Sequence, residues 1–559
     1  MASALVATRL RGLVGARRVL QGTVGPRGGL RVALERSSRA FSSSFSRGDD
    51  NSMSSSAGKR KASVEDTVLQ EQQSSFLRDV DLRTAAGQQK LSKIVQDVAT
   101  AKANSGDFIP HLVIRHLCTH YRGMDIDEKK HFLLILARDL HVDTNTVMES
   151  IDLFRDNLRN VQDSDGEVDW KHEHIERYLR TYRNLASALT PLHETFFKKI
   201  VSQRDGGMLF LVKMRADLQQ VLRKYVDGHA EVSALRSLDA NLKEFLAAWF
   251  SVGFLNLERV TYEHSSGQLL EKIIRYEAVH PVGTVVELKR RLGNGRRCFA
   301  FFHPSIPDEP LVFVHVALVK DIATSMQYIR DETEQLTDDS CADAAIFYSI
   351  SSTQKGLSGI DLGNFLIKEV AKSLKEELPQ LRTYATLSPL PQFMSWLKTQ
   401  RHKNDEDHSL VDVGDLEALR NIPSVKTGAQ SDETPVSTVL RALEIDQWFE
   451  DEALQRTLQP IVLRLGARYI YLEKKRCKAF DPVANFHIRN GAIFERINWL
   501  ADVSKKGLAQ SAGLMVNYKY DLSLVESNNE NYLLHHVIPI GVQPQQVLGV
   551  GELVDVPEC

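Results

Sequence analysis

The spacing of apolar side chains changes near residue 251, and this change divides the chain into two kinds of structure. From about residue 76 to residue 250, apolar residues recur every three or four positions, as in Phe132, Ile135, Leu136 and Leu140. This period places the apolar side chains along one face of an α-helix. We therefore predict an all-α helical bundle domain over residues 76–250.

After residue 251, short β-forming runs replace that pattern. The runs are rich in β-branched and aromatic residues, and helical stretches lie further along the chain. They cover residues 298–302, 311–319 and 344–349. Strands mixed with helices indicate an α/β catalytic-type domain, so we assign the whole chain to the α+β class.

Charge is distributed unevenly along the chain. Residues 1–48 contain nine arginines and one acidic residue, Glu35. This composition is typical of a mitochondrial transit peptide, although a disordered basic tail has it too. The polar residues 49–75 predict a disordered linker. Without the first 48 residues the chain has 61 basic and 71 acidic residues, a net charge of −10, which argues against a nucleic-acid partner.

Apolar stretches and cysteines narrow the class of protein further. No uninterrupted apolar stretch reaches the ~18 residues that a membrane-spanning helix needs, so we expect no membrane span. The five cysteines share no CxxC spacing, so the sequence predicts neither a metal site nor a disulfide framework.

A glycine-containing loop at residues 354–364 joins a predicted strand to a predicted helix. Such a turn exposes backbone N–H groups beside the positive end of a helix, an arrangement that suits a phosphate. The loop lacks the GK[ST] of a Walker loop, and Ile360 stands where a G-x-S-x-G nucleophile elbow needs glycine. The pattern alone fits a phosphate site and a plain strand-to-helix connection equally.

Two further residues are candidates for chemistry. Ser388 precedes Pro389 at the end of a predicted strand, where ligands often bind, although a serine before proline is also a common cap or turn residue. His487 stands close to a bend predicted by Asn490 and Gly491, and an imidazole there is able to act as an acid or a base. A structural histidine is the alternative interpretation.

Two charged segments are weaker candidates. Residues 170–174, Trp-Lys-His-Glu-His, lack HExxH spacing and a third nearby ligand, so we predict a solvated helical face rather than a metal site. The basic residues at 289–291 and 296–297 predict either a solvated turn or a docking site for an anionic nucleotide.

Several sequence blocks, taken together and in order, closely resemble the malonyl-CoA decarboxylases. The resemblance runs from about residue 76 to residue 522, and several blocks are long enough to be specific. The blocks include EAVHP at 277–281, EPLVFVHVAL at 309–318, TQKGLSGIDLGNFLIKEV at 353–370, TLSPLPQF at 386–393, DPVANFHIRNGA at 481–492, RINWLADVS at 496–504 and GLMVNYKY at 513–520.

This resemblance implies that residues 251–522 form a catalytic domain similar to the N-acetyltransferase superfamily (GNAT), which binds acyl-CoA without a metal or organic cofactor. It also implies that Ser388 and His487 carry catalysis and that the assembly is a homotetramer. The loop that contacts CoA in the family matches Ser358, Gly359, Ile360, Asp361, Leu362, Gly363 and Asn364.

The implied reaction converts malonyl-CoA to acetyl-CoA and CO2 through a thioester enolate. We expect His487 to protonate the enolate and Ser388 to assist, because an unassisted serine is a poor base. Two other functions stay open on the sequence, an acyl-CoA-dependent acyltransferase and a non-catalytic malonyl-CoA-binding regulator.

The last segment departs from the family pattern. We expect residues 523–559 to form an atypical C-terminal tail, because the resemblance stops near Leu522 and the chain ends in Val-Pro-Glu-Cys instead of a peroxisomal Ser-Lys-Leu signal. The leader predicts a protein of the mitochondrial matrix, which is also cytoplasmic if it is made without the leader.

Overall fold

The residues described by the computed structural model all belong to one compact unit, Gln73–Cys559. The expected leader (1–48), the expected linker (49–75) and the last ten residues of the chain lie outside the described residues. The structure describes residues 80–101, 108–163, 165–202, 206–224, 230–330, 338–360, 362–402, 410–427 and 433–549.

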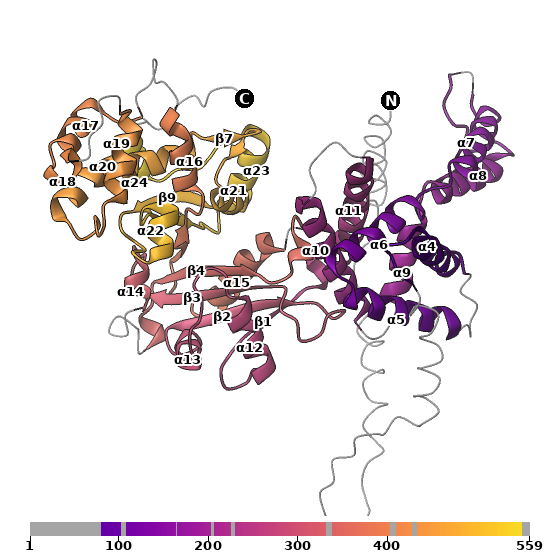
Figure 1. Cartoon of the computed structure of the whole chain (residues 1–559), viewed down its shortest axis with the longest axis horizontal. Coiled ribbons are helices and arrows are strands. Elements are labelled where there is room, and N and C mark those ends of the chain that lie inside the picture. Colours follow the sequence, from indigo (N-terminus) through magenta and orange to yellow (C-terminus); the bar gives the residue numbers. More distant parts are fainter. Residues whose placement is uncertain are drawn as a thin grey trace, which may run out of the picture. The chain divides into compact units, whose positions relative to one another are not determined.

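Helices make up the described chain up to residue 249, as the apolar spacing predicts (Figure 1). Local chemistry sets where they begin. The Asp125 carboxylate accepts hydrogen bonds from the N–H groups of Asp127 and Glu128, and the Glu128 side chain accepts one from the N–H of Asp125. The helices are α4 (Ala85–Thr100), α5 (Phe108–Gly123), α6 (Ile126–Arg138), α7 (Thr144–Arg159), α8 (Ile175–Ala188), α9 (Leu192–Val201), α10 (Gly207–Lys224) and α11 (Ala230–Trp249).

A mixed sheet follows, with strands in the order β1-β2-β3-β4-β5-β10, and with β6 and β9 also paired to β10. Strands β1 to β4 lie side by side in Figure 1. Only the β4–β5 pair is parallel among these described strands. The α+β class predicted from the sequence is thereby confirmed. The strands are β1 (Asn256–Arg259), β2 (Arg296–Phe302), β3 (Val312–Val319), β4 (Ala344–Ser352), β5 (Thr383–Thr386), β6 (Ser388–Pro389), β9 (Ile493–Asn498) and β10 (Met515–Lys519), with a separate hairpin of β7 (Lys474–Lys475) and β8 (Lys478–Ala479).

Helices pack against both faces of β2. Cys298, Ala300 and Phe302 share an apolar cluster with residues of α12 and α13, whereas Phe299 and Phe301 belong to the larger cluster that contains α15. Alternate side chains of a strand point to opposite faces, and both faces of β2 are covered, so every residue of β2 is buried and residues 298–302 form a continuous apolar run. These helices are α12 (Gly267–Tyr276), α13 (Val285–Arg291) and α15 (Gly363–Glu377).

The parallel strands β4 and β5 separate after a short shared stretch. Residues 344–347 of β4 pair with residues 383–386 of β5. Beyond residue 386 the chain pairs with β10 instead, at Ser388 and Pro389, while β4 continues to Ser352. The second half of β4 therefore loses its neighbour on that side, and a cavity opens there.

Helices also dominate the rest of the described chain. The polar segment at 401–435 contains α17 and α18 among its described residues. The bounds are α14 (Met326–Arg330), α16 (Phe393–Thr399), α17 (Val413–Arg420), α18 (Pro423–Lys426), α19 (Pro435–Glu444), α20 (Glu452–Tyr471), α21 (Pro482–Arg489), α22 (Lys505–Ser511), α23 (Val525–His535) and α24 (Val542–Leu548).

Part of the expected C-terminal tail is integrated into the core. Tyr532 of α23 is buried, and its hydroxyl accepts a hydrogen bond from the N–H of Ala479 and donates one to the side-chain oxygen of Asn485, both at 2.8 Å. Helix α24 packs against β9 and α20. These contacts tie residues 525–548 to the strands and helices that precede them.

The segment 170–174 lies between α7 and α8 and is not helical, so the expected helical face is wrong. Its exposure to solvent agrees with the sequence, since the Trp170 side chain is 68% exposed. Among the described residues, no group of three or more His, Cys, Asp or Glu side chains is arranged to hold a metal ion. None of the described helices combines the length and the apolar character needed to cross a membrane.

Candidate active site

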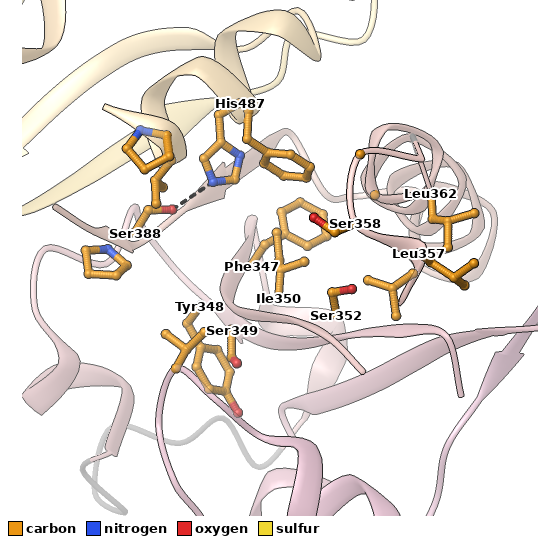
Figure 2. Close-up of a pocket in the computed structure, with 18 of the residues that line it drawn as sticks. Phe347, Tyr348, Ser349, Ile350, Ser352, Leu357, Ser358, Leu362, Ser388 and His487 are labelled. Carbon is orange, nitrogen blue, oxygen red and sulfur yellow. Dashed lines mark hydrogen bonds between the residues drawn. The ribbon is translucent and has the colours of Figure 1, made fainter. Parts of the chain in front are cut away.

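A cavity of about 470 Å³ opens where β4 parts from β5 (Figure 2). The second half of β4, the loop that leads into α15, the short strand β6 and helix α21 form its wall. Apolar side chains such as Phe347, Ile350 and Leu362 line it together with a few polar groups. This combination is typical of a small-molecule site.

Ser388 and His487 meet in this cavity, although 99 positions separate them in the chain. The Oγ atom of Ser388 lies 3.0 Å from Nε2 of His487, as the dashed line in Figure 2 marks. Both side chains are buried, with exposed fractions of 6% and 3%. A hydroxyl and an imidazole in contact inside an apolar cavity form a pair that is able to transfer a proton.

Local sequence positions the serine. Ser388 pairs with Val516 of β10, and Pro389, which has no N–H to donate, pairs with Met515 at the end of the short strand. Ser388 therefore lies near a strand end, two residues beyond the end of β5 and at the start of β6.

A capped helix positions the histidine. The carboxylate of Asp481 accepts hydrogen bonds from the N–H groups of Val483 and Ala484, at 2.9 and 2.8 Å, and so begins α21. Pro482 occupies the first helical position, where an N–H has no partner within the helix. His487 lies in the last turn of α21, so the bend predicted near it is the end of this helix.

The other nitrogen of the imidazole faces a tyrosine. The hydroxyl of Tyr520 lies 2.8 Å from Nδ1 of His487. Burial raises the pKa of Tyr520 well above its usual range, so the hydroxyl stays protonated and donates a hydrogen bond to Nδ1. Ser388 donates to Oγ1 of Thr386 at 3.0 Å, which leaves its oxygen to accept the Nε2 proton. These contacts assign the tautomer that carries its proton on Nε2.

The imidazole is uncharged at neutral pH. Burial lowers the pKa of His487 to about 3, from an ordinary value of 6.5. One face of the ring stacks on Tyr518, with ring centroids 4.7 Å apart. The site therefore offers a rigid, neutral N–H group to whatever occupies the cavity.

Comparison with known proteins decides the family. A family model described as the malonyl-CoA decarboxylase C-terminal domain matches residues 253–545, and one described as the malonyl-CoA decarboxylase N-terminal domain matches residues 154–250. The chain belongs to the malonyl-CoA decarboxylase family. The C-terminal match extends beyond residue 522, so residues 523–545 of the expected tail fall within the family's own domain.

Individual members of the malonyl-CoA decarboxylase family are similar over most of their length. The mitochondrial malonyl-CoA decarboxylase of Mus musculus is 45% identical over 360 residues, which are 64% of this chain and 70% of the mouse protein. The protein of the same name from Anser anser anser is 39% identical over 419 residues, 74% of this chain and 79% of its own length. The crystal structure of malonyl-CoA decarboxylase from Rhodopseudomonas palustris aligns with a TM-score of 0.68 at 33% identity, covering 83% of this chain and 99% of the bacterial chain.

The loop that the sequence resemblance predicts to contact CoA lies on the same cavity as Ser388 and His487. Asp361 is outside the described residues, and Asn364 belongs to the first turn of α15. The remaining residues of the loop line the cavity; they are Ser358, Gly359, Ile360, Leu362 and Gly363.

This loop uses many of its N–H groups internally. The N–H groups of Leu357, Ser358, Ile360 and Leu362 donate to carbonyl oxygens within residues 354–360. Among the described residues, the N–H of Gly359 has no hydrogen-bond acceptor. The N–H groups that remain for the anion cradle expected from the sequence are those of Gly359 and of the first turn of α15.

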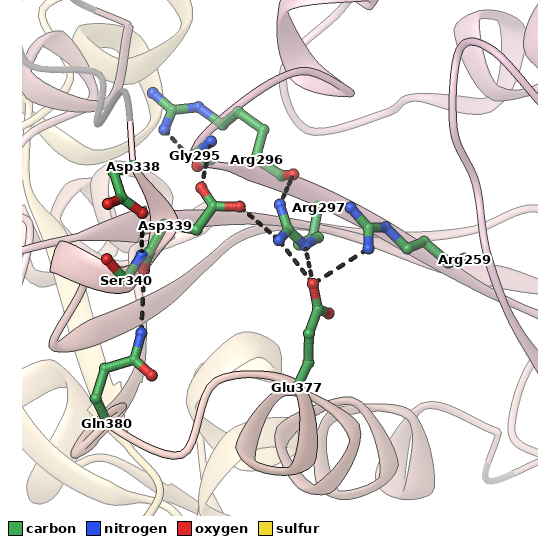
Figure 3. A network of polar contacts seen from close by, with 9 residues as sticks. All are labelled: Arg259, Gly295, Arg296, Arg297, Asp338, Asp339, Ser340, Glu377 and Gln380. Carbon is green, nitrogen blue, oxygen red and sulfur yellow. Dashed lines mark hydrogen bonds and ion pairs between the residues drawn. The ribbon is translucent and has the colours of Figure 1, made fainter.

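None of the basic residues at 289–291 and 296–297 lines this cavity. Arg297 is buried, and its guanidinium pairs with Asp339 at 2.6 Å and with Glu377 at 2.7 Å (Figure 3). Arg296 is buried as well and donates to two backbone carbonyl oxygens. Both interpretations drawn from the sequence are therefore wrong for these two arginines, which join β2 to its neighbours.

Sequence reasoning did not single out Tyr520 or Thr386. Tyr520 follows β10 directly, within the block GLMVNYKY that carries part of the resemblance. That resemblance was the available signal, because nothing in a local pattern tells which distant group a tyrosine hydroxyl will face.

Proposed function

We propose that this chain decarboxylates malonyl-CoA to acetyl-CoA and CO2, which makes it a carboxy-lyase. The observation that carries the proposal is the 3.0 Å contact between Ser388 and His487 in a cavity that the CoA loop also lines. Family membership supports the choice of substrate, because relatives 39% and 45% identical to this chain bear the name malonyl-CoA decarboxylase.

The proposed reaction needs one proton donor. Loss of CO2 breaks the bond between the α-carbon and the carboxylate, and the electron pair stays on the α-carbon and the thioester oxygen as an enolate. We assign the Nε2 proton of His487 to the α-carbon; this transfer leaves an imidazolate, which takes up a proton from solvent and becomes the neutral ring again. The tautomer assigned from the hydrogen-bond partners supports this assignment, because it places the proton on Nε2 of a ring that lines the cavity.

We assign Ser388 a hydrogen-bonding role toward the malonyl carboxylate or the imidazole. A serine hydroxyl is a weak acid, so it does not supply a strong base without a partner that removes its proton. Among the described contacts of the Ser388 hydroxyl, only Nε2 of His487 could act as a base, and Nε2 already holds a proton. The reaction therefore proceeds without an acyl-serine.

The apolar surroundings of the cavity favour loss of the negative charge of the malonyl carboxylate. The cavity is mostly apolar, and neither Ser388 nor the uncharged His487 offers a positive charge to the malonyl carboxylate. A carboxylate in such surroundings is less well stabilised than in water. Decarboxylation followed by protonation converts it into a neutral gas and a neutral acetyl group, which the cavity accommodates at lower free energy.

The loop residues Ser358 to Asn364 are proposed to hold the CoA end of the substrate. Gly359 and Gly363, the first residue of α15, line the same cavity as the catalytic pair, and free N–H groups at the start of a helix are suited to a phosphate. Binding energy gained at the CoA end would then help to hold the malonyl group in place against His487.

We further propose a mitochondrial matrix location and a homotetramer. The leader composition and the names of mitochondrial relatives support the location. For assembly, α7 and α8 expose apolar side chains that a second copy would cover, among them Met148 and Tyr182, 54% and 48% exposed. Light scattering on the purified protein is expected to give the mass of four chains.

A single incubation tests the activity. Purified protein is mixed with malonyl-CoA and no acceptor, and acetyl-CoA is followed by chromatography. A decarboxylase forms acetyl-CoA and CO2, whereas an acyltransferase requires an added amine and a binding regulator returns the substrate unchanged. Loss of product in a His487→Ala variant would exclude a contaminating enzyme.

A further inference from the structure

The helical region directly contacts the strand-to-helix loop at residues 354–364, of which the proposed CoA loop is a part. Gly356 lies so close to α10 that a Cβ atom there would be 1.8 Å from the carbonyl oxygen of Val212. Only glycine permits such an approach of two backbones. The loop therefore rests on a helix from the other half of the chain.

A buried arginine fixes this contact. Arg215 of α10 donates from Nη1 to the carbonyl oxygens of Gly356 and Ser358, at 2.6 and 2.9 Å. Its Nε atom donates to the carboxylate of Asp239 on α11 at 3.0 Å. One guanidinium thus joins the loop to two helices, and its side chain is only 2% exposed.

A second cation lies above the same loop. Lys243 is one helical turn beyond Asp239, and residues four apart share a face of a helix. The Nζ atom of Lys243 lies 3.1 Å from the position that a Cβ of Gly359 would take, where φ is +77°. Among the described residues, this ammonium has no hydrogen-bond or ion-pair partner.

We propose that Lys243 binds a phosphate group of the coenzyme A moiety, so that the helical region completes the substrate site. This assignment rests on the proposed function, because malonyl-CoA brings the phosphates. The loop satisfies most of its N–H groups internally and leaves few donors for an anion. An unpaired ammonium beside Gly359 supplies the missing positive charge. The phosphate is either in the pyrophosphate or at the 3′ position of the ribose.

Calorimetry on the full chain distinguishes these phosphates. CoA is expected to bind Lys243→Ala roughly three- to tenfold more weakly than wild type, as expected for one partly exposed charge-assisted contact. Lys243→Arg is expected to recover most of the affinity. If 3′-dephospho-CoA shows the same loss, the partner is the pyrophosphate; if it shows none, the partner is the 3′-phosphate.

A substrate without phosphate provides the internal control. The kcat/KM of malonyl-pantetheine is expected to be equal in wild type and Lys243→Ala. Lys90→Ala, an exposed lysine on α4, a helix that packs on α5, α6 and α9, is expected to bind CoA as wild type does. Unchanged CoA affinity in Lys243→Ala would overturn the assignment, as would an equal loss with malonyl-pantetheine.

This test is separate from the test of the reaction. A wild-type protein that binds CoA but forms no acetyl-CoA from malonyl-CoA would refute the proposed function and leave the role of Lys243 in CoA binding to be judged by calorimetry alone. A wild-type decarboxylase whose Lys243→Ala variant binds CoA normally would refute only the role of Lys243.

Discussion

The hydroxyl of Tyr520 lies 2.8 Å from Nδ1 of His487, and the hydroxyl of Ser388 lies 3.0 Å from Nε2 of the same ring. Each ring nitrogen therefore has one oxygen partner. Because Tyr520 retains its proton, the two contacts together decide where the imidazole proton resides.

Replacing Tyr520 with phenylalanine is expected to lower kcat roughly tenfold or more and to change KM little, because the ring is then free to place its proton on Nδ1. Steady-state kinetics measure this. Tyr384→Phe is the matched control, since the Tyr384 hydroxyl is buried without a partner among the described residues. Full activity in Tyr520→Phe would show that the tautomer is set by another group.

Removing the proposed proton donor should affect turnover more than binding. His487→Ala is expected to lower kcat about 10²- to 10³-fold, while CoA affinity stays near that of wild type. Kinetics combined with calorimetry separate the two effects. The exposed His264→Ala is expected to behave as wild type. Normal turnover in His487→Ala would disprove the assignment of the donor.

The serine and the histidine should act as a unit. Ser388→Ala alone is expected to lower kcat, and the Ser388→Ala/His487→Ala double variant should be little worse than His487→Ala, because the second change removes an interaction already lost. The measured quantity is the coupling energy from kcat/KM of the four proteins. Additive losses would mean that the two residues contribute independently.

Stability should fall as the pH is lowered from about 6.5. Burial lowers the pKa of His487 to about 3 and that of His193 to about 4, so both stay neutral in the fold while the unfolded chain takes up protons. Each group then reduces the free energy of unfolding by up to about 1.4 kcal/mol per pH unit below 6.5, until its folded pKa is reached. Thermal unfolding at pH 7.5, 6 and 5 measures the slope, which should be shallower in His193→Gln.

The close contact between the loop at residues 354–364 and α10 should not tolerate an added methyl group at Gly356. Gly356→Ala is expected to lower the melting temperature and raise the KM for malonyl-CoA, because the added Cβ would collide with the carbonyl oxygen of Val212. Gly123→Ala, where nothing lies within 4 Å of the added atom, is the control. Equal behaviour of the two variants would contradict the tight contact.

Much of the fold follows from local pattern. The three- and four-residue spacing of apolar side chains predicts the helices up to residue 249, and fully buried strands such as β2 and β3 stand out as apolar runs. Two-residue β6 leaves no such signal, because a strand of that length has no period and is held by its pairing with β10.

The burial of Arg297 could not be predicted from the basic run, because its acidic partners are far away in the sequence. Asp339 and Glu377 lie 42 and 80 positions from Arg297, so the sequence near the arginine shows positive charge and nothing that neutralises it. A charge run looks solvated until tertiary structure supplies its counter-ions.

The candidate site could be predicted only in part, because its residues are also remote from one another in the sequence. Residue type and position made Ser388 and His487 possible catalysts, but only the resemblance preferred them over a turn serine and a structural histidine. Their contact, and the contribution of Tyr520, arise from the pairing of β6 with β10 and from the packing of α21, which no window of sequence contains.

The guanidinium of Arg215 makes the border between the two halves of the chain a poor place to cut. A recombinant fragment starting at residue 251 would retain Ser388 and His487, yet the backbone oxygens of Gly356 and Ser358 would face water instead of their donor. Inhibitor screening against such a truncated product would sample a distorted pocket mouth. The expression unit that preserves the pocket includes both halves.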